Sequence, residues 1–436
     1  DFTNTALKLT YCDNLDCSSS SSTTPDSAGN VGSDPSIALD GGGSPVVAYF
    51  DQGNYDLKLA TPANGAPDAG DTFLSTTTTD VNGAYTFSGL SAGDYLVAVE
   101  SRAVSATAGY DTAQGDSWAE QTYGPAGSLC ANGTGGTLTR STVGACYGGS
   151  DATSSDVFDS ASPDVTTAEH VAGITAGAAA ADFGFSFNVV TNTEGGDTRD
   201  ADATAARTVQ GSLRQFIQNA NAVTGANAMR FVPAEPTNDG TWWEVAVSNP
   251  LPPITGSGTT IDGNAHDLTD GTTARNPNTG FLGSNAGGGV TVGVDDVALP
   301  QVAAPELEID SAGVSSNGIE VRADNTTIRA LGIYGFGSTG TSLTDGDIAV
   351  PSGFSVGGLT VEECVIGTGA GSFSDPGAAG SDGSGVALQD VTGVQSTIQN
   401  NLFGYLDELA VSILSSDNVV VSGNESLNVG QGSNIY

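Results

Sequence analysis

The sequence predicts an all-β protein in which N-terminal β-sandwich-like modules precede a right-handed parallel β-helix with one N-terminal capping helix. Three observations lead to this fold class. Glycine provides 61 of the 436 residues, and short apolar runs alternate with turns rich in Gly, Ser, Asn and Asp. One clear amphipathic helical pattern occurs, at 212–222. Similar apolar segments then recur along the C-terminal half, as expected for stacked coils.

The first predicted domain, 1–62, contains an internal echo that indicates paired strands. The apolar alternation at 6–10 returns at 56–60, and two further strand patterns, 36–40 and 45–51, lie between them. This order of strands and turns resembles the repeats of bacterial β-propeller-like surface proteins. The resemblance implies a β repeat module, of which the chain holds about one copy, too few to close a propeller.

The second predicted domain, 63–190, shows period-two alternation between turns. Tyr85 and Phe87 alternate with polar residues, as in a strand of a hairpin. The stretch 76–100, TTTTDVNGAYTFSGLSAGDYLVAVE, closely resembles the B-type, prealbumin-like repeats of bacterial surface stalks of the Sdr and Cna kind. The resemblance implies a Cna-B-like β-sandwich, here with loop insertions. An alternating aromatic pattern at 181–190 predicts the strand that closes this domain.

The third predicted domain, 191–436, opens with the helical pattern. Ser212 and Gln215 have the spacing of a capping box at a helix N-terminus. The residues that follow place one apolar stripe along the helix: Leu213, Phe216, Ile217 and Ala220. Such a helix before a run of strands is suited to cover the open end of a β-solenoid, whose sheet edges otherwise invite aggregation.

The rest of this domain shows a repeat of strand patterns. Four apolar residues, Ile328, Val361, Ile398 and Val421, align at intervals of 33, 37 and 23 residues. The shortest interval is one bare coil, the longer ones carry loop insertions such as 370–384, and each coil is predicted to have two strands.

One aligned position of the repeat is polar in its last coils. It is occupied in turn by Leu331, Cys364, Asn401 and Asn424. The two asparagines are interpreted either as a hydrogen-bonded ladder along the solenoid or as ordinary turn formers.

The opening of the third domain supports a family resemblance. The segment 187–263, with GSLRQFIQNANA at its centre, resembles the start of bacterial right-handed β-helix proteins of the pectin-lyase-like class. The resemblance spans roughly 190–436 and implies a secreted or surface protein. Since the sequence stops within a coil pattern, the domain is expected to be truncated and to continue in a longer parent chain.

The five cysteines predict an oxidising compartment. Cys12 and Cys17, and likewise Cys130 and Cys146, lie near each other in Ser- and Gly-rich segments, which predicts two local disulfides. Cys364 lies in an apolar strand pattern and is interpreted as a buried free thiol. Disulfides of this kind are typical of secreted or cell-surface proteins.

The charge balance excludes several partners. The chain has 50 acidic and 11 basic residues, for a net charge of −39. Such a surface repels nucleic acids and anionic lipids, so neither is an expected partner. No run of roughly 18 apolar residues occurs, so no direct membrane span is expected.

Calcium is the one cofactor that the sequence suggests. The loop 262–271 places three aspartates and one asparagine close together, the candidate ligands being Asp262, Asn264, Asp267 and Asp270. Carboxylate and amide oxygens suit a hard cation, but the loop lacks the spacing and closing glutamate of an EF-hand. The loop is therefore interpreted either as a calcium site or as an ordinary turn.

No catalytic residues are predicted. A polysaccharide lyase needs a strong base, and the third domain has no lysine, while Arg322 and Arg329 merely flank a turn. A glycoside hydrolase needs two carboxylates on one face, but Glu362 and Glu363 are adjacent and should point to opposite faces of a strand. With two histidines in the whole chain, no Ser–His–Asp set is expected.

The sequence thus favours a non-catalytic extracellular protein, structural or adhesive, that forms part of a surface stalk or self-assembling fibre. Its expected partners are copies of itself, neighbouring domains of a longer chain, or a glycan. The alternative is a carbohydrate-active or carbohydrate-binding β-helix protein. For that alternative, Trp242 and Trp243 are candidates for sugar stacking, although such a pair in a strand more commonly has one ring buried and one at an edge.

Overall fold

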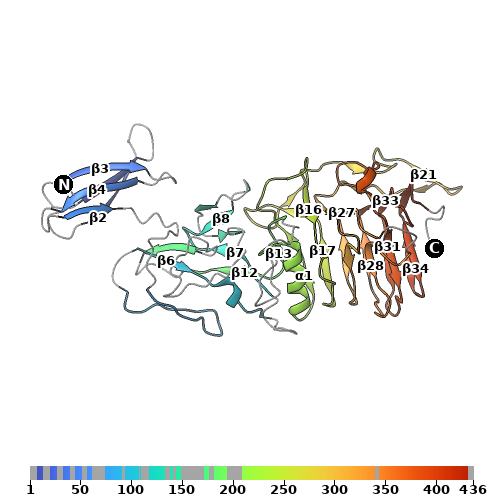
Figure 1. Cartoon of the computed structure of the whole chain (residues 1–436), viewed down its shortest axis with the longest axis horizontal. Coiled ribbons are helices and arrows are strands. Elements are labelled where there is room, and N and C mark those ends of the chain that lie inside the picture. The colour runs from blue at the N-terminus through green and yellow to red at the C-terminus, as the bar shows by residue number, and fades with distance from the viewer. Residues whose placement is uncertain are drawn as a thin grey trace. The chain divides into compact units, whose positions relative to one another are not determined.

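The computed structural model describes residues 7–12, 20–26, 33–39, 45–51, 56–60, 74–90, 94–107, 109, 117–131, 133, 138–140, 144–148, 171–175, 181–193, 209–338 and 343–430. Strands dominate these residues, and parallel sheets fill the C-terminal half, as expected for an all-β chain (Figure 1). The chain divides into two compact units, one of Asp1–Ala66 with Gly93–Tyr95 and one of Pro67–Ala92 with Leu96–Tyr436. The predicted domain boundary at 190 falls inside the second unit.

The first unit consists of antiparallel strands. A three-stranded sheet has the order β3 (Ser33–Leu39), β4 (Pro45–Asp51), β5 (Asp56–Ala60), which are the strands expected from the alternation. A separate pair joins β1 (Leu7–Cys12) to β2 (Ser20–Asp26). Cys12 ends β1, whereas Cys17 lies outside the described residues, so the first predicted disulfide cannot be placed.

The predicted strand at Tyr85 and Phe87 does not form. The described residues 74–90 contain turns and extended chain but no strand. The two rings instead pack edge to face, with centroids 6.0 Å apart, and the Tyr85 hydroxyl donates to the Ala181 carbonyl. The aromatic side chains are therefore held by ring packing and not by a strand ladder. The next predicted strand is present as β6 (Asp94–Ala98), beside β11 (Val171–Thr175).

A small antiparallel sheet precedes the helix. Its central strand, β7 (Glu120–Gly124), lies between β10 (Gly144–Ala145) and β12 (Gly184–Ser186). The single strand predicted at 181–190 is split, because β12 pairs with β7 while β13 (Val189–Val190) pairs in parallel with β15 (Arg230–Phe231).

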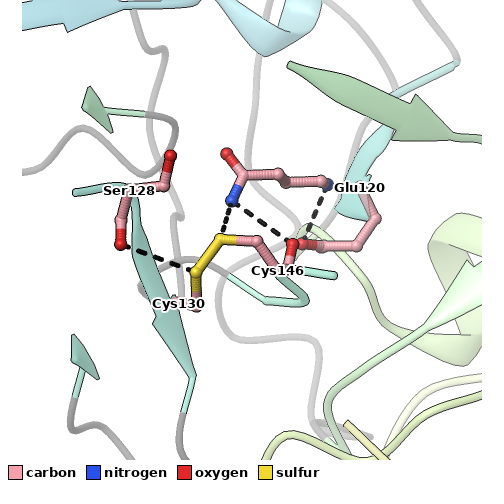
Figure 2. The surroundings of a disulfide bond; sticks show 5 residues. Glu120, Ser128, Cys130 and Cys146 are labelled. Carbon is pink, nitrogen blue, oxygen red and sulfur yellow. Dashed lines mark hydrogen bonds between the residues drawn. A yellow bond between two sulfur atoms is a disulfide. The ribbon is translucent and has the colours of Figure 1, made fainter. Parts of the chain in front are cut away.

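The predicted disulfide between Cys130 and Cys146 is present (Figure 2). Cys130 lies in β8 (Leu129–Ala131), which pairs with β9 (Leu138–Arg140), and Cys146 directly follows β10. Both half-cystines are buried, their Cα atoms are 5.1 Å apart, and Gln121 Nε2 lies 2.7 Å from Cys146 Sγ. The bond therefore links the hairpin of β8 and β9 to the sheet that contains β10.

The helix α1 (Leu213–Ala222) matches the prediction closely. Ser212 Oγ accepts a hydrogen bond from the Gln215 amide at 3.1 Å, which is the N-cap half of the expected box. The predicted apolar stripe of α1 is buried in the main core. Figure 1 shows α1 at the N-terminal end of the stacked sheets, where the Arg214 guanidinium donates to the carbonyls of Asn249 and Pro250. Among the described residues, no helix has the length and apolarity needed to cross a bilayer.

Three parallel sheets follow α1. The first sheet has the order β14–β17–β26–β29–β32–β35, the second β16–β24–β27–β30–β33–β36, and the third β25–β28–β31–β34. In the first sheet the bounds are Asn227–Ala228, Thr259–Asp262, Thr327–Arg329, Thr360–Glu362, Ser396–Gln399 and Val419–Ser422. In the second sheet they are Trp243–Val247, Leu307–Ser311, Leu331–Tyr334, Val365–Ile366, Leu402–Gly404 and Glu425–Leu427. In the third sheet they are Ile319–Glu320, Gly346–Val350, Ser384–Gln389 and Val411–Leu414.

The strand register confirms the predicted repeat. In the first sheet Ile328 pairs with Val361, Val361 with Ile398, and Ile398 with Val421. The column also extends one step towards the N-terminus, to Ile261. Apart from the half-buried Val421, these side chains are buried in one continuous core, where each buried Ile or Val contributes about 1.5–3 kcal/mol.

The four central coils of the described residues have three strands each, not the two that the sequence suggested. The apparent single strand that begins at Thr327 is broken at Ala330, whose φ is +54°, into β26 and β27. The equivalent residues of the next coils, Glu363, Asn400 and Gly423, have φ of +58°, +56° and +64°. Each of these four residues, in the left-handed region, thus turns its coil sharply from the first sheet into the second, and we call these four residues the corner column.

The asparagines after the corner form a ladder. Asn401 Oδ1 accepts from the Cys364 amide at 2.9 Å, and Asn401 Nδ2 donates to the Val361 carbonyl and to Asn424 Oδ1, each at 3.0 Å. Asn424 Nδ2 in turn donates to the Ile398 carbonyl at 2.8 Å. The ladder interpretation is therefore confirmed, and Cys364 is the buried free thiol that was expected, with burial raising its pKa to about 12.

A long insertion between the first and second sheets, 274–306, crosses the outer face of the second sheet, and we call it the strap. It carries three short antiparallel contacts, with β19 (Ala274–Arg275) on β18 (Ala265–His266), β20 (Phe281–Leu282) on β23 (Val302–Ala303), and β21 (Thr291–Val292) on β22 (Val297–Ala298). Val302 packs on Val365 and Leu402, and the Ser284 amide donates to Glu425 Oε1 at 2.8 Å. The strap therefore reaches from the second coil to the last.

The ladder gives the first testable prediction. Asn401→Ala removes the acceptor of the buried Cys364 amide and leaves a small cavity, so we expect the free energy of unfolding to fall by about 2–3 kcal/mol. Urea unfolding followed by circular dichroism measures the change. Gln395→Ala, an exposed change in the same coil, serves as the control and should stay within about 0.5 kcal/mol of the parent. An equal loss in both variants would contradict a special role for the ladder.

Candidate functional site

The predicted calcium loop lies at and after the end of β17. Asp262 Oδ1 accepts from the amide and side chain of Asn264, at 3.1 and 2.7 Å, while Asp262 Oδ2 lies 3.2 Å from Arg329 Nη1. The Asp267 and Asp270 carboxylates accept from the amides and hydroxyls of Thr269 and Thr273. These hydrogen bonds hold the pKa of both aspartates below the ordinary value, and for Asp270 the Thr273 side chain is the largest cause.

The candidate ligands thus bond mainly to their own loop. Within the described ranges, no group of three or more His, Cys, Asp or Glu side chains is arranged to hold a metal ion. The loop has the geometry of Asx turns, in which the carboxylate accepts from residues two or three positions later. The calcium site stays a prediction, and its test is given below.

Arg329 lies in an acidic environment on the outer face of the first sheet. Its guanidinium contacts Asp262 on one side and, on the other, Glu362 at 3.5 Å and Glu363 at 2.8 Å. These contacts, led by the hydrogen bond to Glu363, raise its pKa, so Arg329 stays protonated and does not suit the role of a base.

Glu362 and Glu363 were expected to point to opposite faces of a strand, and this is wrong. Both side chains contact Arg329. The reason is that Glu363 lies outside β29, in the corner column, where its left-handed φ breaks the alternation of side chains. The two carboxylates are therefore neighbours, engaged by one guanidinium.

The tryptophan pair divides as expected. Trp243 is fully buried, its Nε1 donates to the Glu235 carbonyl at 3.0 Å, and the Arg275 guanidinium carbon lies 4.7 Å from the Trp243 ring centroid. Trp242 is half-buried at the strand edge. Its buried Nε1 has no partner in strict hydrogen-bond geometry, although it faces the Glu308 carboxyl.

A group of acids on the outer face of the second sheet was not predicted. We call Asp239, Glu244, Glu308 and Asp310 the carboxyl cluster. Glu244 on β16 pairs directly with Glu308 on β24, and Asp310 pairs with Tyr334 on β27. Their side chains share one face because residues two apart on a strand point the same way.

Burial determines the protonation of this cluster. Glu308 is 1% exposed, and desolvation raises its pKa to about 7 against the hydrogen bond from the Ala370 amide, which lowers it. Desolvation also raises the pKa values of Glu244 and Asp310, whose carboxyls lie within hydrogen-bonding reach of each other. Asp310 Oδ1 is buried without a partner.

The cluster could have been found from the sequence by one alignment. The segments WEVAV at 243–247 and LEIDS at 307–311 have the same alternation, with Glu244 and Glu308 at the same outward position. The two segments are neighbouring strands of one sheet. The 40 residues of 267–306, which directly precede β24, are an insertion that hides the regular spacing of the coils in the sequence.

Chemically, the cluster provides two adjacent carboxyls, those of Glu244 and Asp310, beside an indole and a phenol. Directly hydrogen-bonded carboxyls suit proton transfer, whereas glycoside hydrolysis needs carboxyls about 5–10 Å apart. No protein-family model matches the chain, and no solved structure matches it significantly. A functional assignment for this chain therefore rests on the geometry of its own residues.

The raised pKa values predict a pH dependence of stability. For Glu306 and Glu308, burial raises the pKa from 4.5 to about 7, so the folded state holds these protons more tightly than the unfolded chain. Their stabilising contribution is complete below about pH 4.5 and is lost as the pH rises through about 7. We expect Glu308→Gln to be more stable than the parent by ~2 kcal/mol at about pH 8 and nearly equal to it at about pH 4.5.

Urea unfolding of both proteins at the two pH values measures this effect. Asp295→Asn, at an exposed carboxylate on the strap, is the matched control and should show no such difference. If Glu308→Gln were no more stable than the parent at the higher pH, Glu308 would not have the raised pKa that its burial implies.

Calcium removal tests the loop 262–271. Because its carboxylates are engaged by their own loop, we expect chelation with EDTA to leave the thermal midpoint unchanged. The measurement is a thermal melt with EDTA, with calcium and with magnesium. A drop of several degrees on chelation, reversed by calcium and not by magnesium, would instead establish a structural calcium site.

Proposed function

We propose that this chain is a segment of an extracellular structural or adhesive protein, without catalytic activity, and that residues 191–436 form a right-handed parallel β-helix serving as a rigid scaffold. The observation that carries the proposal is the in-register stacking of three parallel sheets around one aliphatic core. Stacking of this kind produces a stiff rod, because each coil hydrogen-bonds along its length to the next.

An extracellular location is supported by the disulfide and by the net charge of the chain. The disulfide between Cys130 and Cys146 would persist in an oxidising environment. The net charge of −39 keeps a large, Gly-rich surface soluble and disfavours binding to nucleic acid or anionic membrane. Both features fit a stalk or fibre segment whose partners are copies of itself or adjoining domains.

The carboxyl cluster weighs against hydrolysis as the main activity. Its most perturbed member, Glu308, is almost fully buried, and the backbone of Ala370 lies directly against it. The Glu244 and Asp310 carboxyls lie within hydrogen-bonding reach of each other, closer than the roughly 5–10 Å separation that glycoside hydrolysis uses. A substrate could reach the cluster only after the covering chain moved.

A carbohydrate-active or carbohydrate-binding protein is the second candidate. One observation favours it, namely that the half-buried Trp242 ring lies beside the carboxyl cluster. Indole faces stack on sugar rings, and acids hydrogen-bond to sugar hydroxyls.

A polysaccharide screen and electron microscopy decide between the candidates. We expect the purified chain to release neither reducing ends nor unsaturated sugars from a panel of neutral and acidic glycans, and to appear as short rods or end-to-end assemblies by negative-stain microscopy. A clear product that disappears in Glu244→Gln and persists in the control Asp417→Asn would overturn the structural proposal. Rods that stay single at every concentration would remove self-assembly from it.

A further inference from the structure

The segment 367–373, between β30 and β31, covers the carboxyl cluster. Ala370 is fully buried, and its amide donates to Glu308 Oε2. The neighbouring glycines fit closely, since an added Cβ would come within 3.0 Å of Glu308 Oε2 at Gly369 and within 2.3 Å of the Trp242 ring at Gly371. The backbone of 367–373 therefore lies flush on the outer face of the second sheet.

A second set of hydrogen bonds joins this segment to the strap. Asn278 Nδ2 donates to the Ala370 carbonyl at 3.0 Å and to the Pro305 carbonyl at 2.7 Å. Asn278 Oδ1 accepts from Thr241 Oγ1 at 3.0 Å. One buried amide side chain thus links 367–373, both ends of the strap and the turn before β16. The segment is anchored on one side by Asn278 and on the other by Glu308.

The ionisable groups that surround Glu308 in the described structure are all acidic. Glu244 is its register partner on β16, and Asp239 lies in the turn before that strand. Asp310 lies two residues after Glu308 on β24, and the Tyr334 phenol lies on β27. An ionised Glu308 is therefore deprived of water by 367–373 and repelled by Glu244 and Asp239. Both effects are relieved if 367–373 lifts and admits water.

We propose that 367–373 is a pH-sensitive lid, latched by the Glu308 side chain, which seals the outer face of the second sheet while Glu308 is protonated and opens when Glu308 ionises. The Ala370 amide works against opening, because a donated hydrogen bond favours the carboxylate. Burial outweighs it, since the pKa of Glu308 is raised to about 7 in spite of that bond.

Opening would change what the molecule presents to its surroundings. The Trp242 ring lies directly beneath Gly371, and Trp242 Nε1 is buried without a close hydrogen-bond partner in the closed form. With the lid raised, water or a polar ligand could accept a hydrogen bond from this Nε1. This lid adds a regulated surface to the proposed scaffold, because the patch beneath 367–373 would be exposed to ligands only above a threshold pH.

Hydrogen exchange of the full chain, read by mass spectrometry, tests the lid. After correction for intrinsic exchange rates, we expect protection of peptides covering 367–373 to fall at least about tenfold between about pH 5 and about pH 8. Peptides covering β31, in the adjacent core, should keep their protection. Loss in both regions would mean general unfolding, and constant protection of 367–373 would mean a fixed loop, so either result overturns the proposal.

Two variants connect the opening to the latch. Glu308→Gln keeps an acceptor for the Ala370 amide but cannot ionise, so protection of 367–373 should persist at about pH 8. Glu244→Gln removes a repelling neighbour, which lowers the pKa of Glu308 and should shift the midpoint of opening to lower pH. If lid opening in both variants followed the same pH profile as in the parent, Glu308 would not be the latch. If Glu308→Gln folds poorly, the pH profile of Glu244→Gln alone decides the question.

Discussion

Four successive coils of the parallel sheets depend on a single backbone conformation at the corner column. Ala330, Glu363 and Asn400 adopt positive φ without being glycine, which costs about 1 kcal/mol or more for Ala and Glu. The stacked sheets offset this cost in successive coils, because the turn lets one short segment contribute a strand to the first sheet and a strand to the second. The turn also determines where the following residue points. In successive coils these following residues are Leu331 and Cys364, which are buried in the core, and then Asn401 and Asn424, which form the asparagine ladder.

This constraint explains which parts of the fold could be predicted. The inward column of Ile328, Val361 and Ile398 is specified by apolar periodicity, and α1 by its cap and stripe, so both were apparent from the residues alone. The third strand of each coil was not, because the break between β26 and β27 falls at an alanine and the next at a glutamate. Neither residue signals a left-handed turn, and the surrounding stack imposes the conformation.

The carboxyl cluster was missed for a different reason. Glu244 and Glu308 are direct neighbours in space, but most of the chain between them belongs to the strap and not to the coil. Sequence distance is a poor guide to contact wherever such an insertion interrupts a repeat. Tyr85 and Phe87 illustrate the converse, since a clean alternation produced no strand where ring packing held the side chains instead. An alternating pattern predicts a strand reliably only where partner strands are present to complete the ladder.

The strap has a consequence for how the stack comes apart. Solenoids usually unfold from their ends, because each coil touches only its neighbours and the last coil can fray alone. Here the Ser284 amide bonds to Glu425 across 141 residues, while the Val302 side chain packs on the fourth and fifth coils. The strap therefore connects the second coil directly to the fourth, fifth and sixth described coils, so that these coils do not depend on nearest-neighbour contacts alone. A chain in which the strap had not docked would expose the apolar side chains of Val365 and Leu402 on the outer face of the second sheet.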